Sequence, residues 1–273
     1  MKYFKLFLAF FLALLFTACA TSPTGRSQLM LVSPEEAIDA SKEAYMQTLS
    51  PLDAKGKIDN DPKITKRVKL ITGRLISQAI ETHPETSDWG WSVKVIDDPE
   101  TVNAWCMAGG KMAIYTGLLL KVNPTDDELA QVMGHEISHA LAHHTAEKMS
   151  VAMASQAGLS VLSIALSVTG YDLGGLSMTG AELAATTAIS LPNSRTAEEE
   201  ADRMGIELAA KAGYDPHAAA SLWIKMEKAG GDAPPQFLST HPSSDNRQET
   251  LRELAPQMMG YYKEKKVRPV YPL

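Results

Sequence analysis

The sequence GHEISHALAHH, residues 134–144, contains four of the seven histidines in a chain of 273 residues. His135 and His139 lie four positions apart, so on a helix both side chains would share one face, one turn apart. Two imidazoles in that arrangement can bind one zinc ion at about 2.0–2.1 Å. Glu136 would then stand beside the metal, where a general base can take a proton from a zinc-bound water. The pattern HExxH also occurs by chance on solvated helices, so other features of the sequence are needed to show whether it marks a metal site.

The sequence around the histidines predicts a buried helix. Thr125 and Glu128 form a capping box, which predicts a helix from Asp126 to about Met149. One side of this helix is expected to pack in the core, because it carries an apolar stripe of Leu129, Val132, Met133 and Ile137. We expect His143 and His144 to continue the same helix and to project differently from His139.

A catalytic zinc site needs a third protein ligand and a free position for water. The position at which a third histidine often follows HExxH is occupied by Thr145, so this ligand must come from elsewhere. In the segment SRTAEEEADRMG, residues 194–205, Thr196 and Glu199 form another capping box, which predicts a helix to about Ala212 that is closed by Gly213. It offers Glu198, with Asp202 on the same face. The alternatives Glu199 and Glu200 are interpreted as solvated or capping charges.

HExxH followed by SRTAEEEAD (194–202) and STHPSSDNR (239–247) resembles the M48 family of zinc metalloendopeptidases. The resemblance includes TGRSQLMLVS (24–33) and NAWCMAGGKMAIYTGLL (103–119). It implies that Glu198 is the third ligand, which makes the site a gluzincin type with one Zn²⁺ per chain. It also implies that Asp202 orients a ligand histidine by accepting a hydrogen bond from the other ring nitrogen.

The remaining histidines fall into two groups. His241 precedes Pro242, which favours an extended backbone. The family resemblance implies that His241 approaches the open metal position, either to stabilise an oxyanion or to act as a latch, whereas the alternative is a surface histidine. Arg247 is a weaker candidate for the same role. His144 is expected to pack or to form hydrogen bonds, and surface or structural roles are expected for His143, His83 and His217.

The predicted fold is α+β: a mostly helical, zincin-like metallopeptidase domain with one small β-sheet beside the metal-binding helix. WSVKVI (91–96) reads as a strand, and Gly109-Gly110 predicts a hairpin between two more strands. Further helices are expected from the Ser33–Glu36 capping box to Leu49, from Asp61-Pro62 to Glu81, after Asp215-Pro216, and over about 245–254. The peptidase domain is expected to span 61–255, with a C-terminal tail at 256–273.

The predicted hairpin would also hold an extended peptide substrate. A sheet edge binds a peptide through main-chain hydrogen bonds, and the candidate residues are Asn103, Ala104, Gly109 and Gly110. Residues 151–191 are rich in small side chains and are expected to form helices that pack over the metal helix and partly cover the cleft. Gly174-Gly175 would permit a mobile lid. Membrane contact by this segment is the alternative.

The N-terminus predicts export. Residues 1–18 read as a signal peptide, with two lysines by position 5 and an apolar run of eleven residues at 6–16. Cys19 follows in a lipobox-like context, so residues 19–60 are expected to form a lipidated N-terminus, a tether and the first helix. The alternative is plain cleavage near Ala18 or Ala20. By family analogy we expect a periplasmic protein anchored to the outer membrane. With Cys19 lipidated, Cys106 stands alone and no internal disulfide forms.

The composition limits the function. The net charge of −6 argues against nucleic acid as a partner. The favoured hypothesis is a zinc endopeptidase that hydrolyses unfolded or misfolded cell-envelope proteins and uses Glu136 as general base. One alternative is a non-catalytic periplasmic chaperone or assembly factor with a structural zinc, although such a site needs no base. Another is an amidase or other zinc hydrolase.

Overall fold

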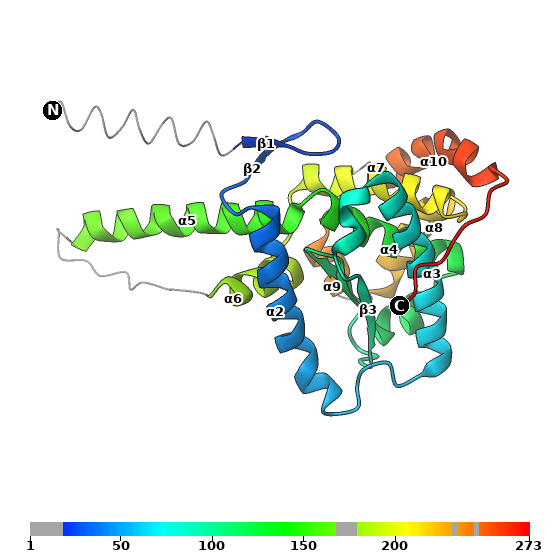
Figure 1. The fold of residues 1–273 in the computed structure, drawn as a ribbon, viewed down its shortest axis with the longest axis horizontal. Coiled ribbons are helices and arrows are strands. Elements are labelled where there is room, and N and C mark those ends of the chain that lie inside the picture. The colour runs from blue at the N-terminus through cyan, green and yellow to red at the C-terminus, as the bar shows by residue number, and fades with distance from the viewer. Residues whose placement is uncertain (1–18, 168–178, 231–233, 243–245) are drawn as a thin grey trace.

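The structure, a computed structural model, describes residues 19–167, 179–230, 234–242 and 246–273. The expected signal peptide and the expected Gly174-Gly175 lid lie outside these residues. Within the part that is described, no helix combines the length and hydropathy needed to cross a membrane. The chain is mostly helical with two small sheets (Figure 1), so the predicted fold class is confirmed.

A three-stranded sheet lies at the centre of the molecule. Strands β3 (Ser92–Ile96), β4 (Ala104–Met107) and β5 (Lys111–Tyr115) are arranged in the order β3-β5-β4. β3 runs parallel to β5, and β4 runs antiparallel to it, so β4 is an edge strand. Gly109 and Gly110 adopt φ values of 72° and 68° in the turn between β4 and β5. The antiparallel pairing of β4 with β5 confirms the predicted hairpin, and glycine adopts these positive φ values at no steric cost.

Both faces of the sheet are buried. On one face Cys106, Met112 and Ile114 join a core that includes Leu75 of α3 (Pro62–Thr82) and Met133 of α4 (Asp126–Leu141). On the other face Trp105, Met107 and Ala113 join a second core with Tyr45 of α2 (Pro34–Asp53). All three helices begin with the caps that the sequence predicts, at Ser33, Asp61 and Thr125. The sheet is thus held between α2 and the helix that carries the HExxH pattern.

The predicted continuous helix from Asp126 to Met149 is wrong. α4 ends at Leu141, His143 has a φ of 55°, and a new helix, α5 (His144–Ser167), begins at once. No glycine or proline marks this break, but the side-chain amide of Gln28 donates to the carbonyl oxygen of Ala142 at 2.8 Å. This tertiary bond satisfies a carbonyl that the helix end leaves free. As a result, His144 turns back towards His139.

α7 (Arg195–Lys211) lies directly against α4. Its N-cap is Ser194, whose hydroxyl accepts from the N–H of Ala197, so the predicted Thr196–Glu199 cap is displaced by two residues. The two helices meet at glycines. A Cβ atom on Gly134 would lie 2.9 Å from the carbonyl oxygen of Gly205, and one on Gly205 would lie 2.8 Å from the backbone nitrogen of His135. Neither position has room for a side chain.

The segment from 151 to 191 is arranged differently from the prediction. α5 contacts α2, β2 (Ser27–Leu29) and the end of α4, and Figure 1 shows it extending away from the helices around the sheet. α6 (Gly180–Ala185) packs mainly against α2 rather than over the metal helix. η3 (Thr186–Ser190) lies beside the edge strand β4.

The remaining elements close the two ends of the chain. β1 (Cys19–Thr21) pairs with β2 in an N-terminal hairpin. The last helix runs to Lys263 and not to Leu254. Pro256 lies inside it, where proline removes one backbone hydrogen bond, but the helix continues past this residue. The final residues return to the body, where Tyr271 N donates to Gly73 O at 2.9 Å. The other elements are η1 (Pro84–Asp88), η2 (Leu118–Val122), α8 (Ala218–Ala229), α9 (Gln236–Thr240) and α10 (Arg247–Lys263).

We expect Gly205→Ala to lower the free energy of unfolding by about 1–3 kcal/mol, because the new methyl group meets backbone atoms that cannot rotate away. Urea denaturation of the zinc-free protein measures this change. Gly260→Ala is the matched control, since Gly260 lies in α10 with nothing within 4 Å of the added Cβ. That variant should gain about 0.5–1 kcal/mol. Equal stability of Gly205→Ala and the wild type would contradict the close packing of α4 and α7.

Candidate metal centre

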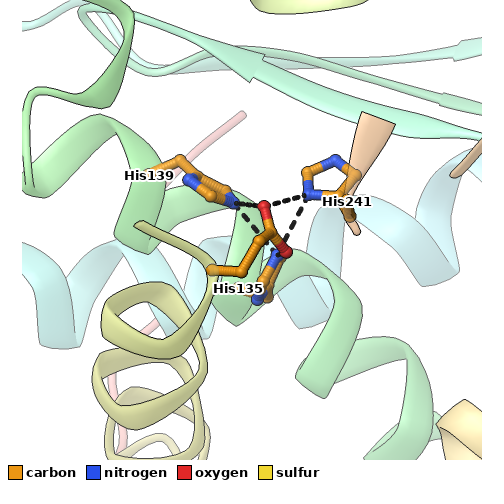
Figure 2. Close-up of side chains that lie close together, drawn as sticks. His135, His139 and His241 are labelled. Carbon is orange, nitrogen blue, oxygen red and sulfur yellow. Dashed lines mark hydrogen bonds and ion pairs between the residues drawn. The ribbon is translucent and has the colours of Figure 1, made fainter. Parts of the chain in front are cut away.

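Four side chains from three parts of the chain meet in one buried cluster. His135 and His139 come from α4, Glu198 from the first turn of α7, and His241 from the residue after α9. One potential ligand atom from each residue lies within 4.8 Å of the other three. Figure 2 shows the three imidazoles turned towards a common point. All four residues are at most 4% exposed.

The distances in this cluster fit a tetrahedral ion. His135 Nε2 lies 3.0 Å from His139 Nε2, and the two Glu198 oxygens lie 3.3 Å from one ring nitrogen each. Ligand atoms at about 2.0–2.1 Å from a tetrahedral centre are separated by roughly 3.3 Å. Glu198 Oε2 is buried and has no hydrogen-bond partner among the described residues, although Arg247 Nη2 lies 3.3 Å away as an ion-pair partner. Two imidazoles and one carboxylate therefore converge as a donor set suited to zinc.

His241 fills the fourth corner of this cluster. Its Nδ1 lies 3.2 Å from His135 Nε2 and 3.0 Å from Glu198 Oε1. The imidazole is stacked on Phe237, with the ring centroids 4.3 Å apart. The alternative of a surface histidine is wrong, because His241 is only 4% exposed. In this arrangement, His241 stands where a water or a substrate would have to enter.

Asp202 and Arg247 lie behind His135. The Nδ1 of His135 is 3.0 Å from Asp202 Oδ1, and Arg247 Nη2 donates to the same oxygen at 2.7 Å. The guanidinium also covers the Trp223 ring at 3.4 Å. Burial alone would lower the pKa of His135, but Glu198 and Asp202 outweigh it and raise the pKa to about 9. Arg247 Nη2 also lies 3.3 Å from Glu198 Oε2, so the guanidinium pairs with two carboxylates of the site, and its suggested role at the open position stays a prediction.

A second chain of contacts lies behind His139. His139 Nδ1 is 2.7 Å from His144 Nδ1, and His144 Nε2 is 3.0 Å from Glu200 Oε2. Arg26 of the N-terminal hairpin donates from Nε to the same Glu200 oxygen at 2.9 Å. The hydrogen-bonding role expected for His144 is confirmed, whereas the prediction of a solvated Glu200 is wrong. Glu199 is exposed, as expected.

Glu136 points into the same buried space. It is 2% exposed, and its Oε1 has no hydrogen-bond partner among the described residues, although His241 Nε2 lies at 3.4 Å. Burial raises the pKa of Glu136, while His241 and His135 oppose that rise. By contrast, the pKa of Glu198 is held well below its usual value, because the three histidines outweigh the effect of burial. The two glutamates thus differ in how strongly their surroundings favour the charged form.

Asn193 is part of this site and was missed from the sequence. Its Nδ2 donates to Glu198 Oε1 at 2.7 Å and lies 3.4 Å from His139 Nε2. Its backbone N–H donates to the carbonyl of Thr240, which joins the start of α7 to the segment that carries His241. No sequence pattern marked this asparagine. Three histidines lie outside the cluster, as expected: His83, His143 and His217.

Comparisons with known proteins agree with this site. The family model described as peptidase family M48 matches residues 62–255. Metalloendopeptidase OMA1, mitochondrial, of Bos taurus is 34% identical over 258 residues, which cover 91% of this chain and 48% of that protein. The beta-barrel assembly-enhancing protease of Escherichia coli K12 is 30% identical over 205 residues, 73% of this chain and 40% of that protein. The chain thus spans about half the length of the curated relatives it matches, or less. On the family match, the chain belongs to peptidase family M48.

Proposed function

We propose that this protein is a zinc-dependent endopeptidase that cleaves unfolded or misfolded proteins of the cell envelope. The observation that carries the proposal is the buried meeting of His135, His139 and Glu198 next to Glu136, whose buried Oε1 has no hydrogen-bond partner among the described residues and faces His241 at 3.4 Å. A structural metal site does not require a buried carboxylate beside its ligands, so the position of Glu136 weighs against a non-catalytic chaperone. The printed names of the relatives, metalloendopeptidase and protease, agree with the proposal.

In the proposed mechanism, His135, His139 and Glu198 hold the metal. When bound, zinc polarises the peptide carbonyl and lowers the pKa of the attacking water. Glu136 accepts the proton of that water at a carboxylate oxygen and delivers it to the amine that leaves. Asp202 keeps His135 in the tautomer whose Nε2 lone pair faces the cluster.

The substrate is proposed to bind along β4, between Asn103 and the Gly109–Gly110 turn. Tyr115 N donates to Asn103 O at 3.1 Å, so in an antiparallel pair Ala104 and Cys106 direct main-chain groups away from the sheet. The outward-facing carbonyl of Val102 already accepts from Phe237, at the start of the element that leads to His241. All four residues of β4 are buried and η3 lies beside this edge, so an extended peptide would have to displace η3 to continue that pairing towards the metal. It would then be recognised largely by its backbone.

The cellular address is proposed from the sequence. Residues 1–18 have the pattern of a signal peptide, and Cys19 would carry the lipid that anchors the periplasmic protein to the outer membrane. The name of the Escherichia coli relative refers to β-barrel assembly, and β-barrels span the outer membrane. Proteins that fail to assemble there are therefore the proposed substrates.

His241 is proposed to be a latch rather than a stabiliser of the oxyanion. Its Nδ1 faces the shared ligand position, and its ring is held by stacking on Phe237. To let water and substrate enter, the ring has to leave this corner. The resting protein would therefore be closed, with only a fraction of molecules competent at any time.

Of the predictions that test the proposed function, the first concerns the base. Glu136→Gln should keep its zinc, because Glu136 is not a ligand, but should cleave an unfolded protein about 10²–10⁴-fold more slowly. Zinc is measured by metal analysis, and cleavage is followed with a denatured substrate. Glu199→Gln, a change of the same kind at an exposed site, should behave as wild type. Unchanged cleavage by Glu136→Gln would rule out the proposed mechanism.

The second prediction concerns the third ligand. Loss of a residue that only hydrogen-bonds to a metal ligand lowers metal affinity about 10–100-fold. Glu198→Gln should lower zinc affinity by more than this, because a ligand itself is lost. Competition with a chelator measures the affinity, and Glu199→Gln is again the control. Full zinc occupancy in Glu198→Gln would mean that another residue is the third ligand.

The third prediction concerns the latch. His241→Ala should retain zinc through the other three ligands and should show faster turnover. If the latch is closed about nine-tenths of the time, its removal raises turnover about 10-fold, because activity scales with the competent fraction. Steady-state cleavage together with metal analysis tests this. Slower turnover would instead favour a role in stabilising the oxyanion, and unchanged turnover would exclude both roles.

A further inference from the structure

The ring nitrogen of His139 that faces away from the metal cluster, Nδ1, is connected to the N-terminal hairpin through buried side chains. The contacts run from His139 Nδ1 to His144 Nδ1 (2.7 Å), from His144 Nε2 to Glu200 Oε2 (3.0 Å), and from Glu200 Oε2 to Arg26 Nε (2.9 Å). His144 is 1% exposed and Glu200 is 5% exposed. Residues separated by more than one hundred positions thus form one line that ends at a candidate metal ligand.

The direction of the hydrogen bonds along this line follows from its carboxylate end. An ionised Glu200 can only accept, so His144 must donate to it from Nε2. The Nδ1 of a neutral His144 is then an acceptor, and His139 must donate to it from its own Nδ1. This leaves the lone pair of His139 on Nε2, which faces His135 and Glu198. A metal requires this tautomer of His139, and the far end of the line selects it.

Arg26 fixes the carboxylate at the end of the line. Its Nη1 and Nη2 donate to both oxygens of Glu147 at 2.7 and 2.6 Å, while its Nε holds Glu200. Glu147 belongs to the first turn of α5, and Glu200 belongs to α7. Thr24 donates to the second oxygen of Glu200. One arginine of the hairpin therefore joins the two helices behind the metal cluster.

We propose that Arg26, Glu200 and His144 are positioning residues that hold His139 in its metal-binding tautomer and orientation, so that the N-terminal hairpin is a working part of the metal site. This inference rests on the proposed zinc site. It adds that metal affinity depends on a segment about 110 residues before the HExxH pattern and outside the matched family region, which begins at residue 62.

The test measures zinc affinity in the full chain by chelator competition. Glu200→Gln should bind zinc about 10–100-fold more weakly, because the amide no longer demands a donor from His144. Arg26→Met keeps the length of the side chain but releases Glu200, and should bind zinc about 10-fold more weakly. Glu199→Gln is the control for the first change. Arg67→Met is the control for the second, because Arg67 pairs with exposed Asp126 at the start of α4 and not with a residue of this line.

Two further measurements separate positioning from a merely structural role. The visible spectrum of the Co²⁺-substituted protein should change in Glu200→Gln and not in Glu199→Gln, because it reports the ligand geometry. The effects of Glu200→Gln and Arg26→Met on zinc affinity should not add in the double variant, because both act through the same line of contacts. Additive effects together with an unchanged spectrum would overturn the proposal.

The outcomes also separate this proposal from the zinc site itself. If the wild type binds no zinc, the proposed function fails. If the wild type binds zinc and Glu200→Gln binds it equally well, only the positioning role fails. Should Glu200→Gln not fold, Arg26→Lys decides the question, because lysine keeps the charge but cannot bridge two carboxylates with a planar fork. Wild-type zinc affinity in Arg26→Lys would overturn the role of the fork.

Discussion

The site depends on how closely α4 and α7 approach each other. Gly134 and Gly205 allow backbone to meet backbone, with no space for a methyl group on either side. Ordinary helix pairs are held 8–10 Å apart by the side chains between them. Here the missing side chains let the Glu198 carboxylate reach between two imidazoles that project from α4. The metal cluster therefore rests on two residues that contribute no side chain to it.

The site also has to stabilise its buried carboxylates while His135 and His139 keep their orientation. Each of the two α4 histidines in the candidate metal centre is connected, at the ring nitrogen that faces away from the cluster, to a carboxylate, directly or through His144, and each carboxylate is connected to an arginine. His135 uses Asp202 and Arg247, whereas His139 uses Glu200 and Arg26 through His144. Burying these carboxylates alone would be costly, and the arginines offset that cost. The break at His143 makes the second line possible, because it turns His144 towards His139.

The sequence predicted those parts of the fold that local chemistry decides. The caps at Ser33, Asp61 and Thr125, the hairpin at Gly109-Gly110 and the pair His135–His139 depend on neighbouring residues only. The helix break at His143 was not predicted, because it depends on Gln28, more than one hundred residues away. Asn193 and Glu200 were missed for the same reason. An asparagine beside a helix start and a glutamate within an acidic run look solvated until distant segments cover them.

The sequence by itself determined the chemistry that is available: two imidazoles one turn apart, a base between them, and a carboxylate with an aspartate four residues later. Only the tertiary structure decided that Glu200 is buried against Arg26 and His144 instead of being solvated. It also decided that His241 fills the last corner. The physical reason is that the spacing of residues in the sequence sets which side chains share a face of a helix. Which residues those side chains contact depends on how distant segments of the chain pack.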